Sequence, residues 1–132
     1  MPQIRQRTVL FADLRGSTSL YETLGNAAAT GVVTRTVAEL GRIGGDEQGR
    51  VVKTLGDGLM ALFESPRQAV AAAEEMHDAL HHMSPVGSSP RAPVLKLKVG
   101  VAHGEVVEMA GDCFGDAVNV AARLIDHAGD NE

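Results

Sequence analysis

The stretch RVVKTLGDGLMALF, residues 50–63, decides the fold, because two short apolar runs flank the turn Gly56-Asp57-Gly58. Asp-Gly between two apolar runs is a strong signal for a β-hairpin. We therefore predict a hairpin with strands over RVVKTL and LMALF and with Asp57 at its tip. A second acidic turn, Gly44-Gly45-Asp46-Glu47, lies just upstream, so the chain holds two candidate turns for chemistry that uses a carboxylate.

The N-terminal part of the chain has the pattern of a strand followed by two helical segments. Residues 8–14 (TVLFADL) form an apolar run that ends in an acid and a polar turn, which is typical of a buried strand. A helical turn is expected over 20–24. Residues 26–43 carry apolar side chains at helical spacing, and Gly44 and Gly45 are expected at the C-terminus of that helix.

The C-terminal part alternates between the same two patterns. Ser65 followed by Pro66 is a favourable start for a helix. Residues 94–109 alternate like a long strand, which we expect to bend near Gly104 into a second strand. The other elements expected here are a helix over 66–83, a loop over 84–93, a turn over 111–116 and a helix over 117–128.

These elements give the order β-α-α-β-β-α-β-β-α within 132 residues, a length that suits one domain. Strands that pair as hairpins and are also separated by helices predict an α+β fold, with an antiparallel-rich sheet and helices packed on one face. Apolar residues make up 44% of the chain and aromatic residues only 3%, so aliphatic side chains must supply the core. We expect residues 1–132 to form a single domain.

Charge and cysteine content narrow the function classes. The net charge of −5 disfavours non-specific binding of nucleic acid, but it permits a local site for a small anion. The single cysteine excludes an internal disulfide framework and suits a reducing compartment. The sequence shows neither a membrane-spanning run nor a signal peptide. We expect a cytoplasmic protein with no nucleic-acid partner and no membrane insertion in this segment.

The upstream acidic turn, Gly44-Gly45-Asp46-Glu47, resembles the signature of diguanylate cyclases. That signature needs a hairpin turn with an apolar strand directly after it. Here Gln48-Gly49-Arg50 follow, and the apolar strand starts only at Val51. We therefore favour a solvated loop between a helix and a strand for Asp46.

The downstream acidic turn places Asp57 at a hairpin tip, while Asp13 ends another apolar strand. If the two strands are neighbours, the two carboxylates meet at one edge of the sheet. Mg²⁺ is usually bound by one or two carboxylates plus substrate phosphates. The alternatives are that Asp57 is a type I′ turn residue and that Asp13 caps the next helix.

Two further groups of residues have the chemistry to bind a nucleotide. Backbone N–H groups at the start of the first helix form a natural phosphate cradle; the residues concerned are Leu14, Arg15, Gly16, Ser17 and Thr18. Asn119 and Arg123 are spaced i, i+4 on the last helix and could bind a ribose oxygen and a phosphate. The alternatives are a surface stripe, with Arg123 attracted to Asp116 or Asp126, and for Lys53 an exposed strand cation paired with Asp57.

Together these pieces resemble the class III nucleotidyl cyclase catalytic domain, the adenylyl and guanylyl cyclase family. The resemblance rests on three motifs in order, VLFADLRGSTSL, VVKTLGDGLMALF and GEVVEMAGDCFGDAVNVAARL, and runs from about Thr8 to Leu124. It implies a ferredoxin-like nucleotidyl cyclase fold. It also implies conversion of ATP to 3′,5′-cyclic AMP and pyrophosphate by a two-metal mechanism at a homodimer interface.

The resemblance also implies a role for each matching residue. Asp13 and Asp57, with the Leu14 carbonyl, would hold two divalent cations, Mg²⁺ or Mn²⁺. Lys53 and Asp112 would read the purine, and this pair is typical of adenine selection. Asn119 would orient the ribose and Arg123 would stabilise charge on the reacting phosphate, with the metal residues in one chain and the other four in its partner.

The sequence departs from the family at its end. The family domain normally adds further strands and a lysine that binds the triphosphate, whereas this chain ends at Glu132, so we expect a C-terminally shortened domain. This leaves open a catalytically silent module of the same fold that binds nucleotide or dimerises. A guanylate cyclase is disfavoured by Lys53 and Asp112. A regulatory domain in the full-length protein is a further expected partner.

Overall fold

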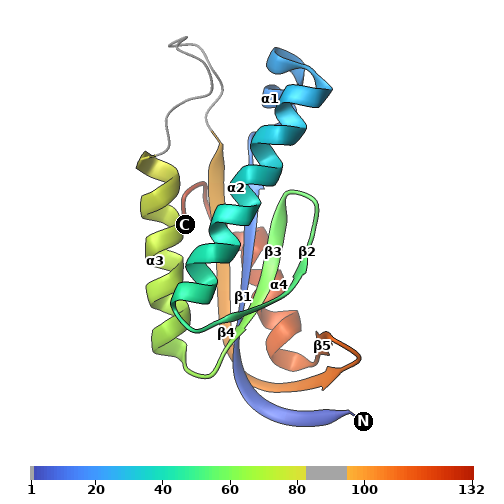
Figure 1. Cartoon of the computed structure of the whole chain (residues 1–132). Coiled ribbons are helices and arrows are strands. Elements are labelled where there is room, and N and C mark those ends of the chain that lie inside the picture. Colours follow the sequence, from blue (N-terminus) through green and yellow to red (C-terminus); the bar gives the residue numbers. More distant parts are fainter. Residues whose placement is uncertain (1, 83–94) are drawn as a thin grey trace.

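Five strands and four helices follow one another in the part of the chain that this computed structural model describes, residues 2–82 and 95–132. In chain order they are β1 (Gln3–Arg15), α1 (Ser17–Leu24), α2 (Asn26–Asp46), β2 (Arg50–Thr54), β3 (Gly58–Phe63), α3 (Pro66–His82), β4 (Lys96–Met109), β5 (Asp112–Phe114) and α4 (Asp116–His127) (Figure 1). The loop predicted over 84–93 lies outside the described residues.

The strands form one sheet in the order β2-β3-β1-β4-β5, and each neighbouring pair is antiparallel. The central pair is β1 and β4, whose register runs from Gln3 opposite Glu108 to Arg15 opposite Lys96. Every residue of β3 is buried, because this strand lies inside the sheet with a helix layer on each face. The predicted α+β fold with an antiparallel sheet is confirmed.

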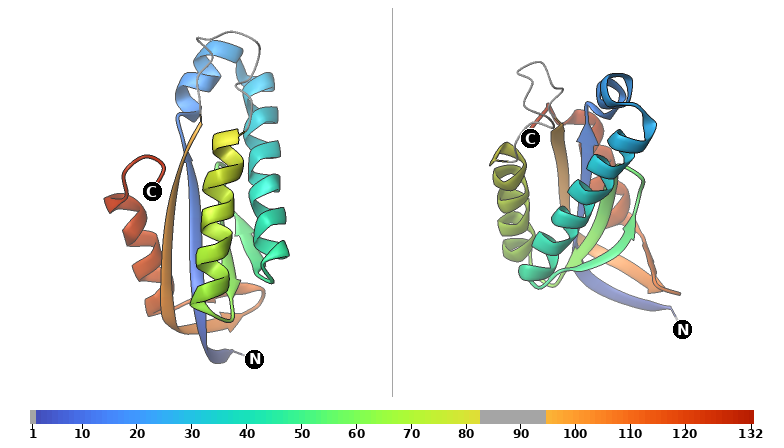
Figure 2. Two further views of the ribbon diagram at one scale, coloured as in Figure 1. Left: turned by 90° about the vertical axis from the view of Figure 1, so that its left-hand side faces the viewer. Right: turned by 45° about the horizontal axis from the view of Figure 1, so that its top comes forward.

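The helices form two layers rather than the single layer that we predicted. Helices α2 and α3 lie on one face of the sheet and α4 lies on the other (Figure 2). Alternate residues of β1 therefore enter different cores: Leu10 packs in the α2–α3 core and Val9 in the α4 core. Because strand side chains alternate between faces, a sheet covered on both faces gives the nearly continuous apolar runs seen in the sequence.

Two predicted boundaries were wrong, the end of α2 and the start of β1. Helix α2 does not stop at Gly44 but continues to Asp46, and Gly44 is buried within the helix where it faces Met76 and Phe63. Strand β1 starts at Gln3, five residues before the expected start, where its polar side chains are exposed but its backbone pairs with β4.

Strand β4 is one continuous strand from Lys96 to Met109 and does not divide at Gly104. Gly104 pairs with Arg7 in the ladder. The segment predicted as a turn contains the short strand β5, which returns after Ala110 and Gly111, both with positive φ.

The glycines of β4 admit helix α4. A Cβ at Gly100 would lie 2.3 Å from the carbonyl oxygen of Ala121, a contact that no real side chain tolerates, and a Cβ at Gly104 would touch Ala117. Helix α4 therefore packs closely on the strand backbone, which fixes the position of its outward-facing residues. No helix in the described ranges has the length and apolar character needed to cross a membrane.

Candidate active site

The predicted hairpin forms, and its tip is tied to the end of β1. The Leu55 amide donates a hydrogen bond to the Gly58 carbonyl oxygen at 2.8 Å, which closes a two-residue turn of Gly56 and Asp57. Gly56 has φ +65°, but Asp57 is not among the residues with positive φ, so the turn is not of type I′ as the alternative interpretation required. The Leu14 amide donates to the Asp57 carbonyl oxygen at 2.8 Å, so Asp57 lies beside the strand end that carries Asp13.

Asp13 and Asp57 lie together, as the sequence predicted. Burial raises the pKa of Asp13, and the neighbouring Asp57 raises it further, against the lowering effects of Arg15 and Lys98. The approach depends on Gly58, where a Cβ would lie 2.3 Å from the Ala12 carbonyl oxygen. The alternative for Asp13, an N-cap, is wrong, because the N-cap of α1 is Gly16 with φ +93°.

This pair of carboxylates fits a divalent cation that completes its coordination with phosphate. No group of three or more His, Cys, Asp or Glu side chains able to hold a metal ion occurs among residues 2–82 and 95–132. Two carboxylates and a nearby backbone carbonyl are few ligands for Zn²⁺, which usually takes three or four protein ligands. They suit Mg²⁺ or Mn²⁺, because such ions accept one or two carboxylates together with substrate oxygens.

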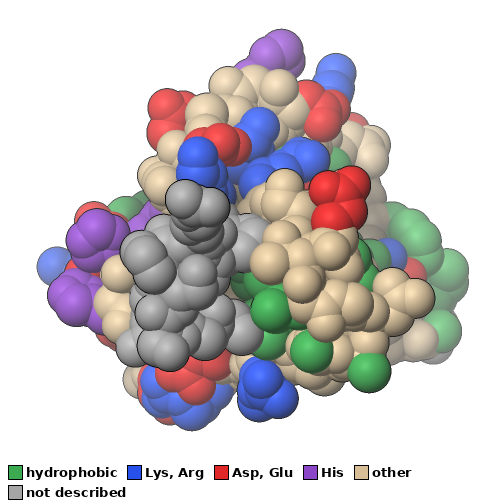
Figure 3. All heavy atoms as spheres, turned by 90° about the horizontal axis from the view of Figure 1, so that it is seen from above, with side chains coloured by type: hydrophobic (Ala, Val, Ile, Leu, Met, Phe, Trp, Pro, Cys, Tyr) green, Lys and Arg blue, Asp and Glu red, His purple; other side chains and the backbone are tan. Residues whose placement is uncertain are grey.

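Two positively charged residues, Arg15 and Lys98, lie next to Asp13. Arg15 Nη2 lies 3.0 Å from Asp13 Oδ2, and Lys98 stands directly opposite Asp13 in the β1–β4 register. Figure 3 views the end of the molecule toward which β1 runs, and it shows Lys and Arg side chains beside Asp and Glu side chains. Sequence reasoning missed Lys98, since only the strand register places it next to Asp13.

The predicted phosphate cradle lies at the junction of β1 and α1. Gly16 separates Arg15 at the strand end from Ser17, the first residue of α1. The cap residue makes no side-chain hydrogen bond to the first turn, so the N–H groups of that turn have no side-chain cap. Because the segment Leu14–Thr18 follows Asp13 directly in the chain, these N–H groups come within a few residues of its carboxylate.

Lys53 and Asp112 are brought together from opposite ends of the sheet. Lys53 Nζ lies 3.2 Å from Asp112 Oδ1 and 3.3 Å from Oδ2. The pKa of Asp112 is lowered, first by the hydrogen bond that its Oδ1 accepts from the Cys113 amide and then by Lys53. The alternative pairing of Lys53 with Asp57 is not formed. A bulge in β2 between Val51 and Lys53 shifts the register and places Lys53 opposite Met60.

Asn119 and Arg123 lie on the exposed surface of α4, away from any partner within the described chain. Neither side chain makes a hydrogen bond or ion pair with residues 2–82 or 95–132, and the predicted alternatives for Arg123, Asp116 and Asp126, are not within ion-pair distance. Apolar side chains surround them on the same helix: Val120 and Leu124 are each 42% exposed. A polar pair inside an exposed apolar helix face is typical of a surface that meets another molecule.

The upstream acidic turn holds no site. Asp46 is the last residue of α2 and is paired with Arg42, whose Nη1 lies 2.6 Å from Asp46 Oδ2. The Gly49 amide donates to the Gly44 carbonyl oxygen at 2.8 Å and closes the helix end. The expected loop position of Asp46 is therefore wrong, because Asp46 belongs to the helix, but its exposure to solvent agrees with the expectation.

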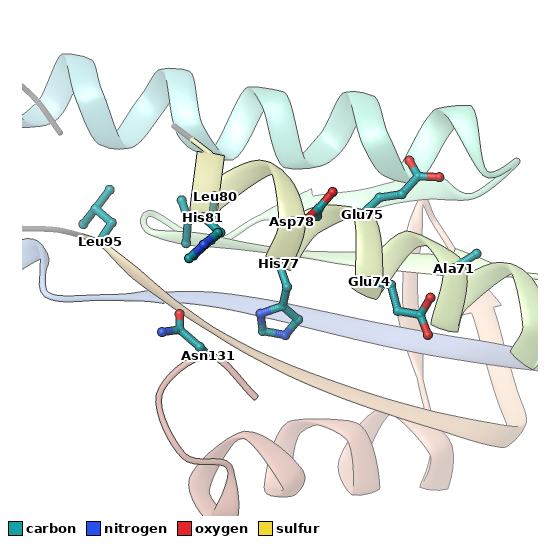
Figure 4. Close-up of a pocket in the computed structure, with 9 residues that line it drawn as sticks. All are labelled: Ala71, Glu74, Glu75, His77, Asp78, Leu80, His81, Leu95 and Asn131. Carbon is teal, nitrogen blue, oxygen red and sulfur yellow. The ribbon is translucent and has the colours of Figure 1, made fainter. Parts of the chain in front are cut away.

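A separate cavity of about 850 Å³ lies between α3 and the C-terminal segment (Figure 4). Its lining includes His77, His81 and Glu74 from α3 and Asn131 from the chain end. Burial lowers the pKa of His77, and the Glu132 backbone partly offsets this effect. None of the predicted site residues lines this cavity.

Comparison with known proteins identifies the family. The model of the adenylate and guanylate cyclase catalytic domain matches residues 1–132. An uncharacterized protein of Mycobacterium tuberculosis is 35% identical over 115 residues, which cover 87% of this chain and 28% of the relative. A pH-sensitive adenylate cyclase of the same species is 36% identical over 124 residues, 94% of this chain and 29% of that relative. The chain therefore spans less than a third of the length of these relatives.

Solved structures share the fold. The adenylyl cyclase CyaB from Pseudomonas aeruginosa superposes with a TM-score of 0.82 at 23% identity, over 100% of this chain and 76% of the other. A bacterial light-regulated adenylyl cyclase gives a TM-score of 0.81 at 26% identity, over 96% of this chain and 41% of the other.

Proposed function

The chain belongs to the family of adenylate and guanylate cyclase catalytic domains, and from this premise we propose that it is an adenylate cyclase domain that converts ATP to 3′,5′-cyclic AMP and pyrophosphate. The observation that carries the proposal is the meeting of Asp13 and Asp57 at the hairpin tip, beside the start of α1. Adenylate cyclases among the relatives, in Mycobacterium tuberculosis and in Anabaena cylindrica, support it.

The reaction needs an in-line displacement at the α-phosphorus. The ribose 3′ oxygen forms a bond to that phosphorus, the bond to the bridging oxygen of the β-phosphate breaks, and pyrophosphate leaves while the hydroxyl proton passes to solvent. Asp13 and Asp57, with the Leu14 carbonyl, would hold two Mg²⁺ or Mn²⁺ ions. When bound, these ions make the 3′ hydroxyl more acidic and neutralise charge on the phosphates.

The residues of this chain supply position and charge around that centre. The Arg15–Thr18 segment directs backbone N–H groups toward phosphate oxygens. Arg123 offers a planar guanidinium for the charge that develops on the reacting phosphate, and Asn119 offers an amide for the ribose.

Base selection follows from the donor and acceptor pattern of Lys53 and Asp112. Adenine presents an amino donor at C6 and an acceptor at N1, which match a carboxylate acceptor and an ammonium donor. Guanine presents an acceptor at C6 and a donor at N1. It would therefore place its acceptor against the Asp112 carboxylate and its donor against the Lys53 ammonium group. A buried mismatch of this kind costs more than a lost contact, because polar groups stay unpaired.

The exposure of Asn119 and Arg123 supports a site completed by a second copy of the chain. Asp13 and Asp57 of one chain would face Lys53, Asp112, Asn119 and Arg123 of its partner, which gives two sites in a homodimer. Exposed apolar side chains on α4 and β5 supply surface for such contact, among them Phe114 at 46% exposure. We expect the longer protein to carry a regulatory region as well.

The test is product formation from ATP and from GTP with Mn²⁺ and with Mg²⁺, in wild type and in Asp57→Asn. We expect cyclic AMP in excess over cyclic GMP, and loss of both in the variant. Excess cyclic GMP would make the chain a guanylate cyclase. No product from either nucleotide at high protein concentration would contradict the catalytic role and favour a silent module of the same fold.

A further inference from the structure

We propose that Arg15 is a built-in counter-ion of Asp13, which a divalent cation must displace in order to bind. This inference rests on the metal site of the proposed function. It assigns to the Arg15 side chain a role distinct from that of the backbone around it, namely control of metal affinity.

The geometry places the guanidinium of Arg15 on an oxygen of the Asp13 carboxylate. Asp13 and Arg15 are two residues apart on β1, so their side chains project from the same face of the sheet. Arg15 Nη2 lies 3.0 Å from Asp13 Oδ2. The side chains are 43% and 29% exposed, so solvent and ions have access to the pair.

The charges explain why a counter-ion is needed here. Asp57 lies beside the strand end that carries Asp13, and the cations next to Asp13 are Arg15, which is paired with it, and Lys98, which stands opposite it in the β1–β4 register. Two adjacent carboxylates without a cation repel each other. A guanidinium and a divalent cation on the same carboxylate also repel each other, since like charges a few ångströms apart interact unfavourably even near a protein surface. The two cations therefore compete.

The Arg15 side chain is incompletely hydrogen-bonded, so little holds it beside Asp13. Its Nε is buried and has no hydrogen-bond partner among the described residues, so the guanidinium uses only part of its five donors. A buried donor without a partner is unfavourable. Movement of the side chain away from Asp13 would let this group reach water or a phosphate oxygen, which lowers the barrier to metal entry.

The test is the affinity of the nucleotide-free protein for Mn²⁺, followed by electron paramagnetic resonance of free Mn²⁺. We expect Arg15→Gln to lower the Mn²⁺ dissociation constant about three- to tenfold, because one ion pair and one repulsion are removed. Arg15→Lys keeps the charge and should stay near wild type. The Mn²⁺-induced rise in Tm should also be larger in Arg15→Gln than in wild type.

Arg7→Gln is the matched control, since Arg7 lies on the same strand face but about 20 Å from Asp13 by strand rise. It should change the dissociation constant by less than about twofold, as expected for a screened distant charge. Equal tightening in Arg7→Gln and Arg15→Gln would overturn the inference in favour of net charge. Unchanged or weaker Mn²⁺ binding in a folded Arg15→Gln protein would also overturn it.

Asp57→Asn separates this inference from the proposed function. If Mn²⁺ binding is the same in Asp57→Asn as in wild type, or if wild type binds no Mn²⁺, the metal site fails and the counter-ion role fails with it. If binding depends on Asp57 but Arg15→Gln does not tighten it, only the role of Arg15 is overturned.

Discussion

Asp13 is a residue whose charge the fold disfavours. Its pKa is raised above 3.8 by burial and then, despite Arg15, by Asp57. A carboxyl with a raised folded-state pKa costs stability when it is ionised. That cost is present at neutral pH and disappears as the pH falls through the raised pKa. At neutral pH and without a bound cation, the ionised Asp13 therefore lowers the stability of the folded protein.

Asp57→Asn should therefore stabilise the metal-free protein. The amide keeps the shape of the side chain but removes the charge beside Asp13, so we expect the free energy of unfolding in EDTA to rise by up to about 1 kcal/mol. Thermal unfolding in EDTA measures this. Asp78→Asn, at a 77% exposed side chain, is the control and should have no effect. A lower Tm for Asp57→Asn than for wild type would contradict the like-charge description.

Part of the site was predictable at this scale and part was not. The hairpin signal placed Asp57 at a turn and the apolar run placed Asp13 at a strand end, so their meeting needed only that the strands be neighbours. Lys53 and Asp112 lie far apart in sequence and their contact depends on the β2 bulge and the β5 return. Lys98 required the β1–β4 register, which alternation within one strand cannot supply.

Helix α4 packs closely on β4 because two residues of that strand, Gly100 and Gly104, have no side chain. A Cβ at Gly100 would lie 2.3 Å from the Ala121 carbonyl oxygen, so Gly100→Ala must push the helix outward. We expect a loss of about 1–3 kcal/mol in the free energy of unfolding, the usual range for overpacking. Denaturant unfolding measures it.

Gly45→Ala is the matched control for this change. Gly45 lies in a helix and has nothing within 4 Å of its added Cβ, so the substitution should leave stability unchanged or raise it by up to about 1 kcal/mol. If Gly100→Ala unfolds at the same denaturant concentration as Gly45→Ala, the close packing of α4 on β4 is contradicted.

The free energy of unfolding should depend on pH because of His77, which lies on α3. Burial lowers its pKa below 6.5, and the Glu132 backbone partly offsets this effect. The unfolded chain then takes up a proton at a higher pH than the folded chain, so stability falls as the pH drops below about 6.5 and levels off below the lowered pKa. His77→Gln should flatten the Tm profile between about pH 7.5 and 5.

His82→Gln is the control on the same helix, because the His82 side chain is 71% exposed. It should leave the shape of the profile unchanged. A profile of the His77→Gln protein that falls as steeply as that of wild type would exclude His77 as the source of the dependence.

Element types were predictable because period and turn chemistry agree along most of the chain. Element ends were not, because tertiary contacts override local preference. Gly44 and Gly45 favour a helix stop, but Gly44 is buried within α2 and the helix continues to Asp46. Gly104 favours a break, but thirteen consecutive pairs with β1 keep β4 continuous.

At the scale of the whole molecule, the outer surface of α4 combines exposed polar and exposed apolar side chains. It carries Asn119 and Arg123 without partners in the described chain, and Val120 and Leu124 are exposed beside them. The sequence predicted the α+β class, but it could not show that α4 covers the face opposite α2 and α3. The apolar stripe of a helix does not say which face of a sheet it will meet.

Val120→Glu should weaken self-association. In the proposed homodimer, a charge within the apolar contact is desolvated without a partner, so we expect the dimer dissociation constant to rise at least about tenfold. Sedimentation velocity over a dilution series measures it. Val70→Glu is the control, because Val70 is 47% exposed on α3, on the other side of the sheet. An equal effect of both substitutions would place the interface elsewhere.

The most direct test of the two-chain adenylate cyclase site is complementation between two inactive variants. Asp57→Asn and Arg123→Ala would be co-expressed and assayed for cyclic AMP production from ATP with Mn²⁺. If each site takes Asp57 from one chain and Arg123 from the other, a mixed dimer has one intact site. Half of randomly formed dimers are mixed, so activity should return to about a quarter of the wild-type level. Activity no greater than the sum of the separate variants would contradict the shared site.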